Sequence, residues 1–213
     1  MENIKSLLGN IRRTDTTAAN VFIADVSELD IKKALNLVSQ GRIEKINRLK
    51  KESAKKLSAG AELLLRYAAC KITCREDFDI SYTADKRGKP YFTFEKGLYF
   101  SLSHSGSLVS CVISPFETGV DVQHVRKTDI HIVEKYFTKD EQSLIGSNIS
   151  EFTRLWARKE AAAKADGAGI AIGLDSLDVS SDIVVSGSEC FLVSDIDTKI
   201  GSYKAAAAIR LAP

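Results

Sequence analysis

The sequence predicts an α+β fold built from two similar halves. Helical patterns followed by several short strand patterns occur on both sides of about Glu117, without the regular strand–helix alternation of a doubly wound sheet. The 213 residues are 44% hydrophobic and 27% charged, which is ordinary globular composition with enough apolar material for a sizeable core. We therefore expect an N-terminal half over residues 1–116 and a C-terminal half over residues 117–213.

Helices in the first half are predicted from apolar residues at helical spacing. An apolar run at residues 20–26 predicts the opening strand, after which Ser27 is expected to cap a helix that ends at Gly41. A long, mostly buried helix is expected across residues 57–68.

Strand pairs complete the first half. Alternating residues at 78–82 and 91–94 predict two strands joined by a turn at 85–90, which contains Gly88 and Pro90. Residues 98–104 and 107–114 predict a hairpin around Ser105 and Gly106.

The second half opens with a short strand from Gly119 to Val125, in which Val120 and Val122 face one way and Asp121 the other. Thr138 to Glu141 forms a capping box, which predicts a helix to about Ser147.

An amphipathic helix over residues 152–164 is the central element of this half, with Ser150 as its cap and Gly167 as its stop. The segments 177–179, 183–185, 190–193 and 203–211 are expected to be strands.

Charge is balanced overall but uneven along the chain. The net charge of +2 argues against a general nucleic-acid binder. Residues 42–56 carry seven basic and two acidic side chains, whereas residues 175–198 carry six acids and no Lys or Arg. The basic run could receive an anion such as a phosphate, or it could be ordinary solvated helix surface.

We expect a cytoplasmic protein. No N-terminal signal pattern is found, and no apolar run approaches the ~20 residues that span a bilayer. Cys70, Cys74, Cys111 and Cys190 lack zinc-ligand spacing, so buried free thiols are expected.

Three charged residues suggest chemistry. Glu160 and Lys164 lie one turn apart on the same helix face, where an acid beside an ammonium is commonly just a surface salt bridge. Asp121 adds a second acid on a strand, in a place that packing does not favour. If the carboxylates of Asp121 and Glu160 converge, they suit a hard cation such as Mg²⁺.

Polar residues on the predicted turns are weaker candidates. Lys89 lies between Gly88 and Pro90, where a rigid turn could aim its ammonium, although a solvated turn lysine is the commoner case. Ser103, His104 and the following serine form a compact set of hydrogen-bonding groups, although His104 could also be a surface imidazole.

Four motifs in order carry a resemblance to a known family. They are GKPYF at residues 88–92, FSLSHSG at 100–106, GVDV at 119–122, and WARKEAAAK at 156–164 followed by a GAGI exit. With this order and spacing, the chain resembles the Sfp-type 4'-phosphopantetheinyl transferases, which prime carrier proteins from coenzyme A. The resemblance implies a pseudo-twofold pair of α+β halves, coenzyme A in the cleft between them, and Mg²⁺ on the pyrophosphate.

The resemblance also implies a role for each matching residue. Asp121 and Glu160 would be the metal-binding carboxylates, with Glu160 also the proton acceptor, and Lys164 would lie against the reacting phosphates.

For the rest of coenzyme A, the resemblance implies phosphate contacts from Ser103 and His104 and a contact from Lys89 to the nucleotide end.

Gln123 departs from the family pattern, because many members place a third acid two residues after the aspartate. The strand period of two puts Gln123 on the same face as Asp121, so its amide oxygen or a water could still ligate the metal. With one negative ligand fewer, we expect weaker Mg²⁺ binding and the same chemistry.

The function that the resemblance implies is Mg²⁺-dependent transfer of 4'-phosphopantetheine from coenzyme A to a serine of an apo acyl or peptidyl carrier protein, the reaction of a holo-[acyl-carrier-protein] synthase. This transfer releases 3',5'-ADP. One alternative is a metal-dependent nuclease, although Ala162 stands where such sites usually have their lysine. The other is a coenzyme A or carrier-protein binding module without transfer, for which Gln123 is the only support. The expected partners include no nucleic acid and no membrane, and the internal duplication favours a monomer.

Overall fold

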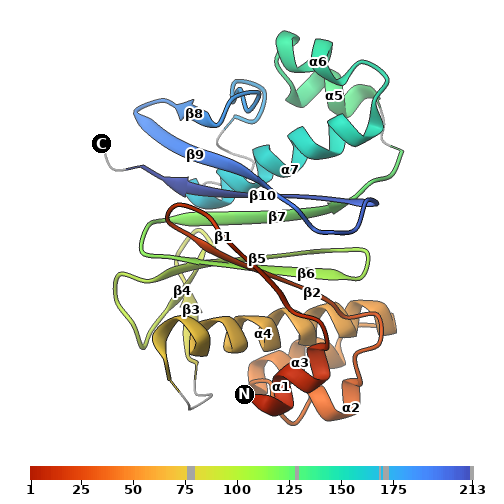
Figure 1. The fold of residues 1–213 in the computed structure, drawn as a ribbon, viewed down its shortest axis with the longest axis vertical. Helices are drawn as coiled ribbons and strands as arrows, with labels where there is room; N and C mark the ends of the chain where they lie inside the picture. The colour runs from red at the N-terminus through yellow and green to blue at the C-terminus, as the bar shows by residue number, and fades with distance from the viewer. Residues whose placement is uncertain (76–79, 128–129, 168, 170–172, 212–213) are drawn as a thin grey trace.

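Two antiparallel sheets lie face to face between two layers of helices in this protein (Figure 1). The structure is a computed structural model that describes residues 1–75, 80–127, 130–167, 169 and 173–211. None of the helices within these residues is long and apolar enough to cross a membrane.

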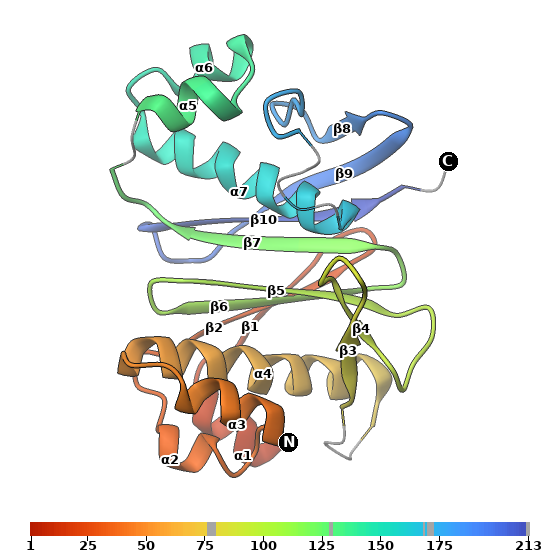
Figure 2. The same cartoon turned by 180° about the vertical axis from the view of Figure 1, so that it is seen from behind.

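The first sheet contains four strands with a long helix on its outer face. Its spatial order is β1 (Arg12–Asp15), β2 (Asn20–Asp25), β6 (Leu108–Ser114) and β5 (Tyr99–Ser105). Helix α4 (Glu52–Thr73) covers this sheet, and the shorter helices α1 (Glu2–Leu8), α2 (Ile31–Ala34) and α3 (Gln40–Asn47) lie around it (Figure 2). A separate hairpin of β3 (Tyr82–Ala84) and β4 (Pro90–Phe92) lies beside β5.

The second sheet has the order β7 (Thr118–His124), β10 (Tyr203–Arg210), β9 (Glu189–Ile196) and β8 (Ile183–Ser186). Helix α7 (Ile149–Asp166) covers its outer face, and α5 (Ile130–Tyr136) and α6 (Lys139–Ile145) lie further out.

Three strands and the long helix of each sheet repeat one topology, while the fourth strands differ, because β1 pairs with β2 and β8 pairs with β9. In the first, β2 is followed by α4 and then by β5 and β6, and β6 returns to pair with β2. In the second, β7 is followed by α7 and then by β9 and β10, and β10 returns to pair with β7. The predicted α+β class with two similar halves is thus confirmed, and a domain boundary after residue 116 stays our proposal.

Three apolar clusters hold the layers together. Leu64 and Phe100 belong to the cluster between α4 and the first sheet. Val112 and Val120 belong to the cluster between the sheets, and Leu155 belongs to the cluster under α7. Because strand residues alternate between faces, Val120 packs between the sheets while Asp121 points toward α7, as the sequence predicted.

The predicted helix from Ser27 to Gly41 is wrong. Asp30 caps the four-residue helix α2. A new helix then begins after Ser39, whose hydroxyl accepts the backbone N–H of Arg42, so Gly41 lies inside α3. Capping side chains divide the apolar pattern here, because each satisfies the open N–H groups of a new helix start.

The helix ends of the second half are closer to prediction. The Thr138–Glu141 capping box is present. Gly167 ends α7 in the left-handed region at φ 85°, as expected, whereas the N-cap is Asn148 and not Ser150.

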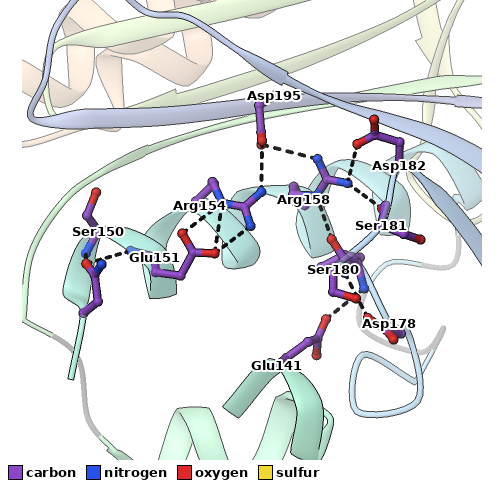
Figure 3. Close-up of polar contacts among 12 residues, drawn as sticks. Glu141, Ser150, Glu151, Arg154, Arg158, Asp178, Ser180, Ser181, Asp182 and Asp195 are labelled. Atoms are coloured by element: carbon purple, nitrogen blue, oxygen red, sulfur yellow. Dashed lines mark hydrogen bonds and ion pairs between the residues drawn. The ribbon is translucent and has the colours of Figure 1, made fainter. Parts of the chain in front are cut away.

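The predicted strand at residues 177–179 is also wrong, because side chains take its backbone hydrogen bonds. Arg158 Nε donates to the Val179 carbonyl at 2.7 Å, and Glu141 accepts the Val179 N–H at 2.8 Å. Figure 3 shows Arg158 and Glu141 approaching this segment from α7 and α6. Neither backbone group of Val179 is therefore free to join a sheet ladder.

Two further predictions meet the structure in part. The predicted strand at 78–82 and the GAGI exit extend outside the described residues, while residues 82–84 and 90–92 do form the expected hairpin. The four cysteines form no disulfide; Cys70 and Cys111 are buried, whereas Cys74 is exposed and Cys190 is half-buried. The expectation of buried thiols is therefore correct for two of the four.

Candidate functional site

Helix α7 lies directly on strand β7, and a glycine permits the close approach. A Cβ atom at Gly119 would lie 2.0 Å from the carbonyl oxygen of Ala161, a separation that no side chain tolerates. The helix face that carries Glu160 and Lys164 is therefore held against the strand that carries Asp121.

Asp121 is the centre of this contact. Its side chain is 3% exposed, and Lys164 Nζ lies 2.7 Å from its Oδ1. Ser103 donates its hydroxyl to the same oxygen at 2.6 Å, and Gln123 donates its side-chain N–H to Oδ2 at 2.8 Å. Three side chains from β5, β7 and α7 therefore fix the orientation of one buried carboxylate.

Glu160 lies half-buried beside this group. Among the residues that the structure describes, it has no hydrogen-bond or ion-pair partner. Burial raises the pKa of Glu160, the negative charge of Asp121 raises it further, and Lys164 partly opposes both effects. A nearby cation would relieve the cost of keeping both carboxylates charged.

The donor set fits a hard divalent cation. Asp121 and Glu160 supply carboxylate oxygens, and the amide oxygen of Gln123 has no hydrogen-bond partner within the described ranges. The described part of the chain has no group of three His, Cys, Asp or Glu side chains that could hold a metal ion. At this site the third candidate ligand, after the two carboxylates, is the amide of Gln123. Two carboxylates and an amide suit Mg²⁺, which keeps waters and phosphate oxygens as its other ligands.

A pocket of about 280 Å³ opens where the two halves meet. Its lining includes Lys89 and Leu102 from the first half and Ala163 and Lys164 from the second. Two lysines in one pocket give it the positive charge that a phosphate-bearing ligand requires.

Lys89 joins the two halves at one end of this pocket. Its Nζ donates to the carbonyl oxygen of Ala165 at 2.5 Å and lies 3.7 Å from a carboxylate oxygen of Glu117. Burial lowers the pKa of Lys89, while Glu117 and Asp166 act in the opposite direction. The turn does aim this ammonium, toward the C-terminal end of α7, where carbonyl groups favour a cation.

His104 lies on β5 beside Ser103 but does not line the pocket. Its ring is exposed. Contact with neighbouring protein lowers the pKa of His104, and the positive charges of Lys164 and Lys45 lower it further. The structure thus brings Lys45 of α3 close to His104, which the sequence could not select from its basic run.

Two residues of the basic run at 42–56 have different roles in the structure. Arg42 Nε binds the fully buried carboxylate of Glu62 at 3.0 Å, and its Nη2 donates to the Tyr82 hydroxyl at 2.8 Å. Arg42 therefore stabilises the contact between α3 and α4. Lys45, in contrast, lines a second pocket of about 450 Å³ on this side.

Lys159 was missed by the sequence analysis, although it directly precedes Glu160. Its Nζ lies 2.7 Å from Glu141, and both side chains are fully buried. It also donates to the carbonyl oxygen of Leu174 at 2.8 Å. Fully buried charges are stable only when paired and hydrogen-bonded, so this pair fixes the orientation of α7 next to the site.

These features define an α+β protein whose acid–lysine site lies between two halves of one topology. Residues 117–208 match a family model described as the 4'-phosphopantetheinyl transferase superfamily. A 4'-phosphopantetheinyl transferase of Bacillus subtilis is 30% identical over 148 residues, which cover 67% of this chain and 66% of that protein.

Two further relatives carry the same description. The 4'-phosphopantetheinyl transferase Sfp of Bacillus subtilis strain 168 is 28% identical over 160 residues, covering 72% of this chain and 71% of the relative. The 4'-phosphopantetheinyl transferase gsp of Aneurinibacillus migulanus is 32% identical over 120 residues, covering 54% and 50%. The aligned part of this chain thus spans between half and about seven-tenths of these relatives. The chain belongs to the 4'-phosphopantetheinyl transferase superfamily.

Proposed function

We propose that this protein transfers the 4'-phosphopantetheine group of coenzyme A to a serine of an apo acyl or peptidyl carrier protein, the holo-[acyl-carrier-protein] synthase reaction. One observation carries the proposal: Asp121, Glu160 and Lys164 meet beside a lysine-lined pocket between the two halves. Family membership argues against the alternative of a metal-dependent nuclease.

Asp121, Glu160 and Gln123 would hold Mg²⁺. The ion, when bound, would offset the charge of the pyrophosphate and polarise its phosphorus–oxygen bonds. Lys164 is 30% exposed, so its ammonium can contact a phosphate oxygen while it stays against Asp121.

Glu160 is the proposed proton acceptor. The carrier serine oxygen forms a bond to the β-phosphorus of coenzyme A, and the bond from that phosphorus to the bridging oxygen of 3',5'-ADP breaks. The serine proton passes to Glu160, directly or through one water, and Lys164 offsets the charge on the departing ADP. Glu160 has no other hydrogen-bond or ion-pair partner among the described residues, so its carboxylate is available for this role.

The remaining candidates bind the rest of coenzyme A. Lys89 faces the pocket and would contact the nucleotide end. Lys45 lies close enough to His104 to lower the pKa of the imidazole, and both side chains would contact a phosphate, while Ser103 orients Asp121.

Mass spectrometry of carrier proteins tests the proposal. Incubation with coenzyme A, Mg²⁺ and apo acyl and peptidyl carriers should add one phosphopantetheine to at least one carrier, and should release 3',5'-ADP. Binding of coenzyme A without any adduct would favour the binding module. We further infer a cytoplasmic monomer, for which light scattering of the purified protein measures the oligomeric state.

A further inference from the structure

Three alternating residues, Ser103, Ser105 and Ser107, connect the first half to the second. Ser105 Oγ accepts the backbone N–H of His124 at 3.0 Å. The backbone N–H of Ser107 donates to the Tyr203 hydroxyl at 2.9 Å. Ser103 binds Asp121, as described above, and we call these three contacts the serine seam.

The serine seam takes the place of a backbone ladder. β5 is an edge strand of the first sheet and β7 is an edge strand of the second, and no backbone pairing joins them within the described residues. Alternate residues of a strand point to one side, so Ser103 and Ser105 both face β7. Hydroxyl groups therefore supply the hydrogen bonds between β5 and β7 at the site, while the apolar cluster that contains Val112 and Val120 packs the two sheets together.

Tyr203 forms the far end of the serine seam. The residue is 9% exposed, and its ring makes an edge contact with His124, with 4.8 Å between the ring centroids. A Cβ atom at Gly106 would lie 2.1 Å from the Tyr203 hydroxyl, and Gly106 has φ 59°. Only glycine fits this turn, so the β5–β6 turn packs directly against the side chain of Tyr203.

The serine seam runs beside groups that belong to different halves. His104 lies between Ser103 and Ser105 on β5, in the first half. Asp121 lies on β7, in the second half. A ligand that contacts His104 and also the acid–lysine cluster must span this junction.

We propose that Ser105 and Tyr203 are positioning residues that set the distance between His104 and the cluster of Asp121, Glu160 and Lys164. This inference rests on the proposed function, in which coenzyme A contacts both sides. Loss of either hydroxyl allows the halves to separate locally, so coenzyme A loses affinity.

The test compares hydroxyl deletions in the full chain. Tyr203→Phe and Ser105→Ala should each raise the KM and the Kd for coenzyme A about three- to tenfold, the factor expected for one lost hydrogen bond. The KM for the carrier should stay within about twofold. Ser105→Thr keeps the hydroxyl and should restore the KM for coenzyme A to nearly the parent value.

Ser114→Ala is the matched control, because Ser114 donates to the Ala18 carbonyl at 2.9 Å within the first half alone. Its KM for coenzyme A should equal that of the parent. A merely structural role would lower the folded fraction and kcat in all variants without changing the KM or the Kd.

Two results overturn the inference. Unchanged coenzyme A affinity in Tyr203→Phe and Ser105→Ala, with an active parent, overturns it alone. A parent protein that neither binds coenzyme A in calorimetry nor modifies any carrier overturns the proposed function, and the inference with it.

Discussion

Lys164 Nζ lies 2.7 Å from Asp121 Oδ1 and 3.1 Å from the carbonyl oxygen of Val120, which joins α7 to β7. The aspartate side chain is 3% exposed and the lysine side chain 30% exposed. The buried carboxylate is therefore neutralised from one side, while the ammonium keeps a face toward solvent. This arrangement leaves a cation available at the point where phosphates would bind.

Removing the charge of Asp121 should abolish transfer. Asp121→Asn keeps the size of the side chain and can still accept the Ser103 hydroxyl, but it loses the negative ligand. We expect kcat/KM to fall by at least about 100-fold, because the pyrophosphate charge is then poorly matched. Asp121→Ala and Glu160→Ala should be similarly inactive. Asp15→Asn, at an exposed ion pair with Arg13, is the control. Near-normal turnover of the Asn variant would remove Asp121 from the metal site.

Trp156→Ala should act through packing. The ring is only partly buried and stacks on Phe152, with ring centroids 6.2 Å apart. A fully buried tryptophan would cost roughly 3 to 5 kcal/mol, so we expect a loss of about 2 kcal/mol in the free energy of unfolding. Urea denaturation measures it. Activity at temperatures well below the melting point should be nearly normal, and a selective loss of kcat in a fully folded variant would show a role at the site.

Glu160→Gln should stabilise the fold while it removes activity. Since the pKa of Glu160 is raised by burial and by Asp121, its charged form is unfavourable in the folded protein. A carboxyl group with a raised folded-state pKa contributes stability at low pH that is lost as the pH rises through this pKa. Without Mg²⁺, the variant should therefore melt at a higher temperature than the parent at pH 7.5, and the difference should shrink as the pH falls toward 4.5.

The role of Glu160 as proton acceptor predicts the pH dependence of the parent. Transfer should decline at acidic pH, because a protonated Glu160 cannot accept the serine proton. Glu134→Gln, at an exposed glutamate on α5, controls for surface charge.

The melting prediction has its own contrary outcome. A Glu160→Gln variant that melts at or below the parent temperature at pH 7.5 would contradict the like-charge interaction with Asp121.

Gln123→Glu should tighten Mg²⁺ binding. The Gln123 amide donates to Asp121 Oδ2 at 2.8 Å, so the side chain lies on the side of the metal ligands. Glutamate cannot donate this hydrogen bond and adds a like charge, so the metal-free variant should melt at a lower temperature than the parent. Its third carboxylate should lower the Mg²⁺ midpoint of transfer, with little change in maximal turnover. Gln142→Glu on α6 is the control, and an unchanged midpoint would place Gln123 outside the metal's surroundings.

Local signals made much of this chain predictable. The capping box at Thr138 and the glycine at 167 act within one helical turn, so short-range chemistry alone determines them. The strand proposed at 177–179 failed because its hydrogen-bond partners, Arg158 and Glu141, come from distant parts of the chain.

The candidate site shows the same division. Its residues lie within short motifs that the sequence analysis selected, and the structure brings Asp121, Lys164 and Ser103 together. The contacts between halves could not be predicted, because the partner of Ser107 is Tyr203, which is 96 residues away. No local sequence pattern predicts a contact between residues so far apart in the chain.

Gly119→Ala should disturb the site without touching a proposed ligand. Gly119 does not have a positive φ, so the cost of a side chain there is steric. The added Cβ would meet Ala161 O at 2.0 Å and Ala165 N at 2.6 Å, both of them backbone atoms that cannot rotate away. Helix α7 must shift outward, which moves Glu160 and Lys164 away from the strand that holds Asp121.

We expect Gly119→Ala to lower stability by about 1 to 3 kcal/mol, the usual cost of overpacking, and to lower kcat/KM by at least about 100-fold. Gly41→Ala is the matched control, because nothing lies within 4 Å of the added Cβ on α3. Since alanine favours helix over glycine, the control should keep full activity and gain up to about 1 kcal/mol. Urea denaturation and transfer assays at a temperature where both variants are folded separate the two effects. Full activity in a folded Gly119→Ala variant would show that the contact between α7 and β7 does not set the geometry of the site.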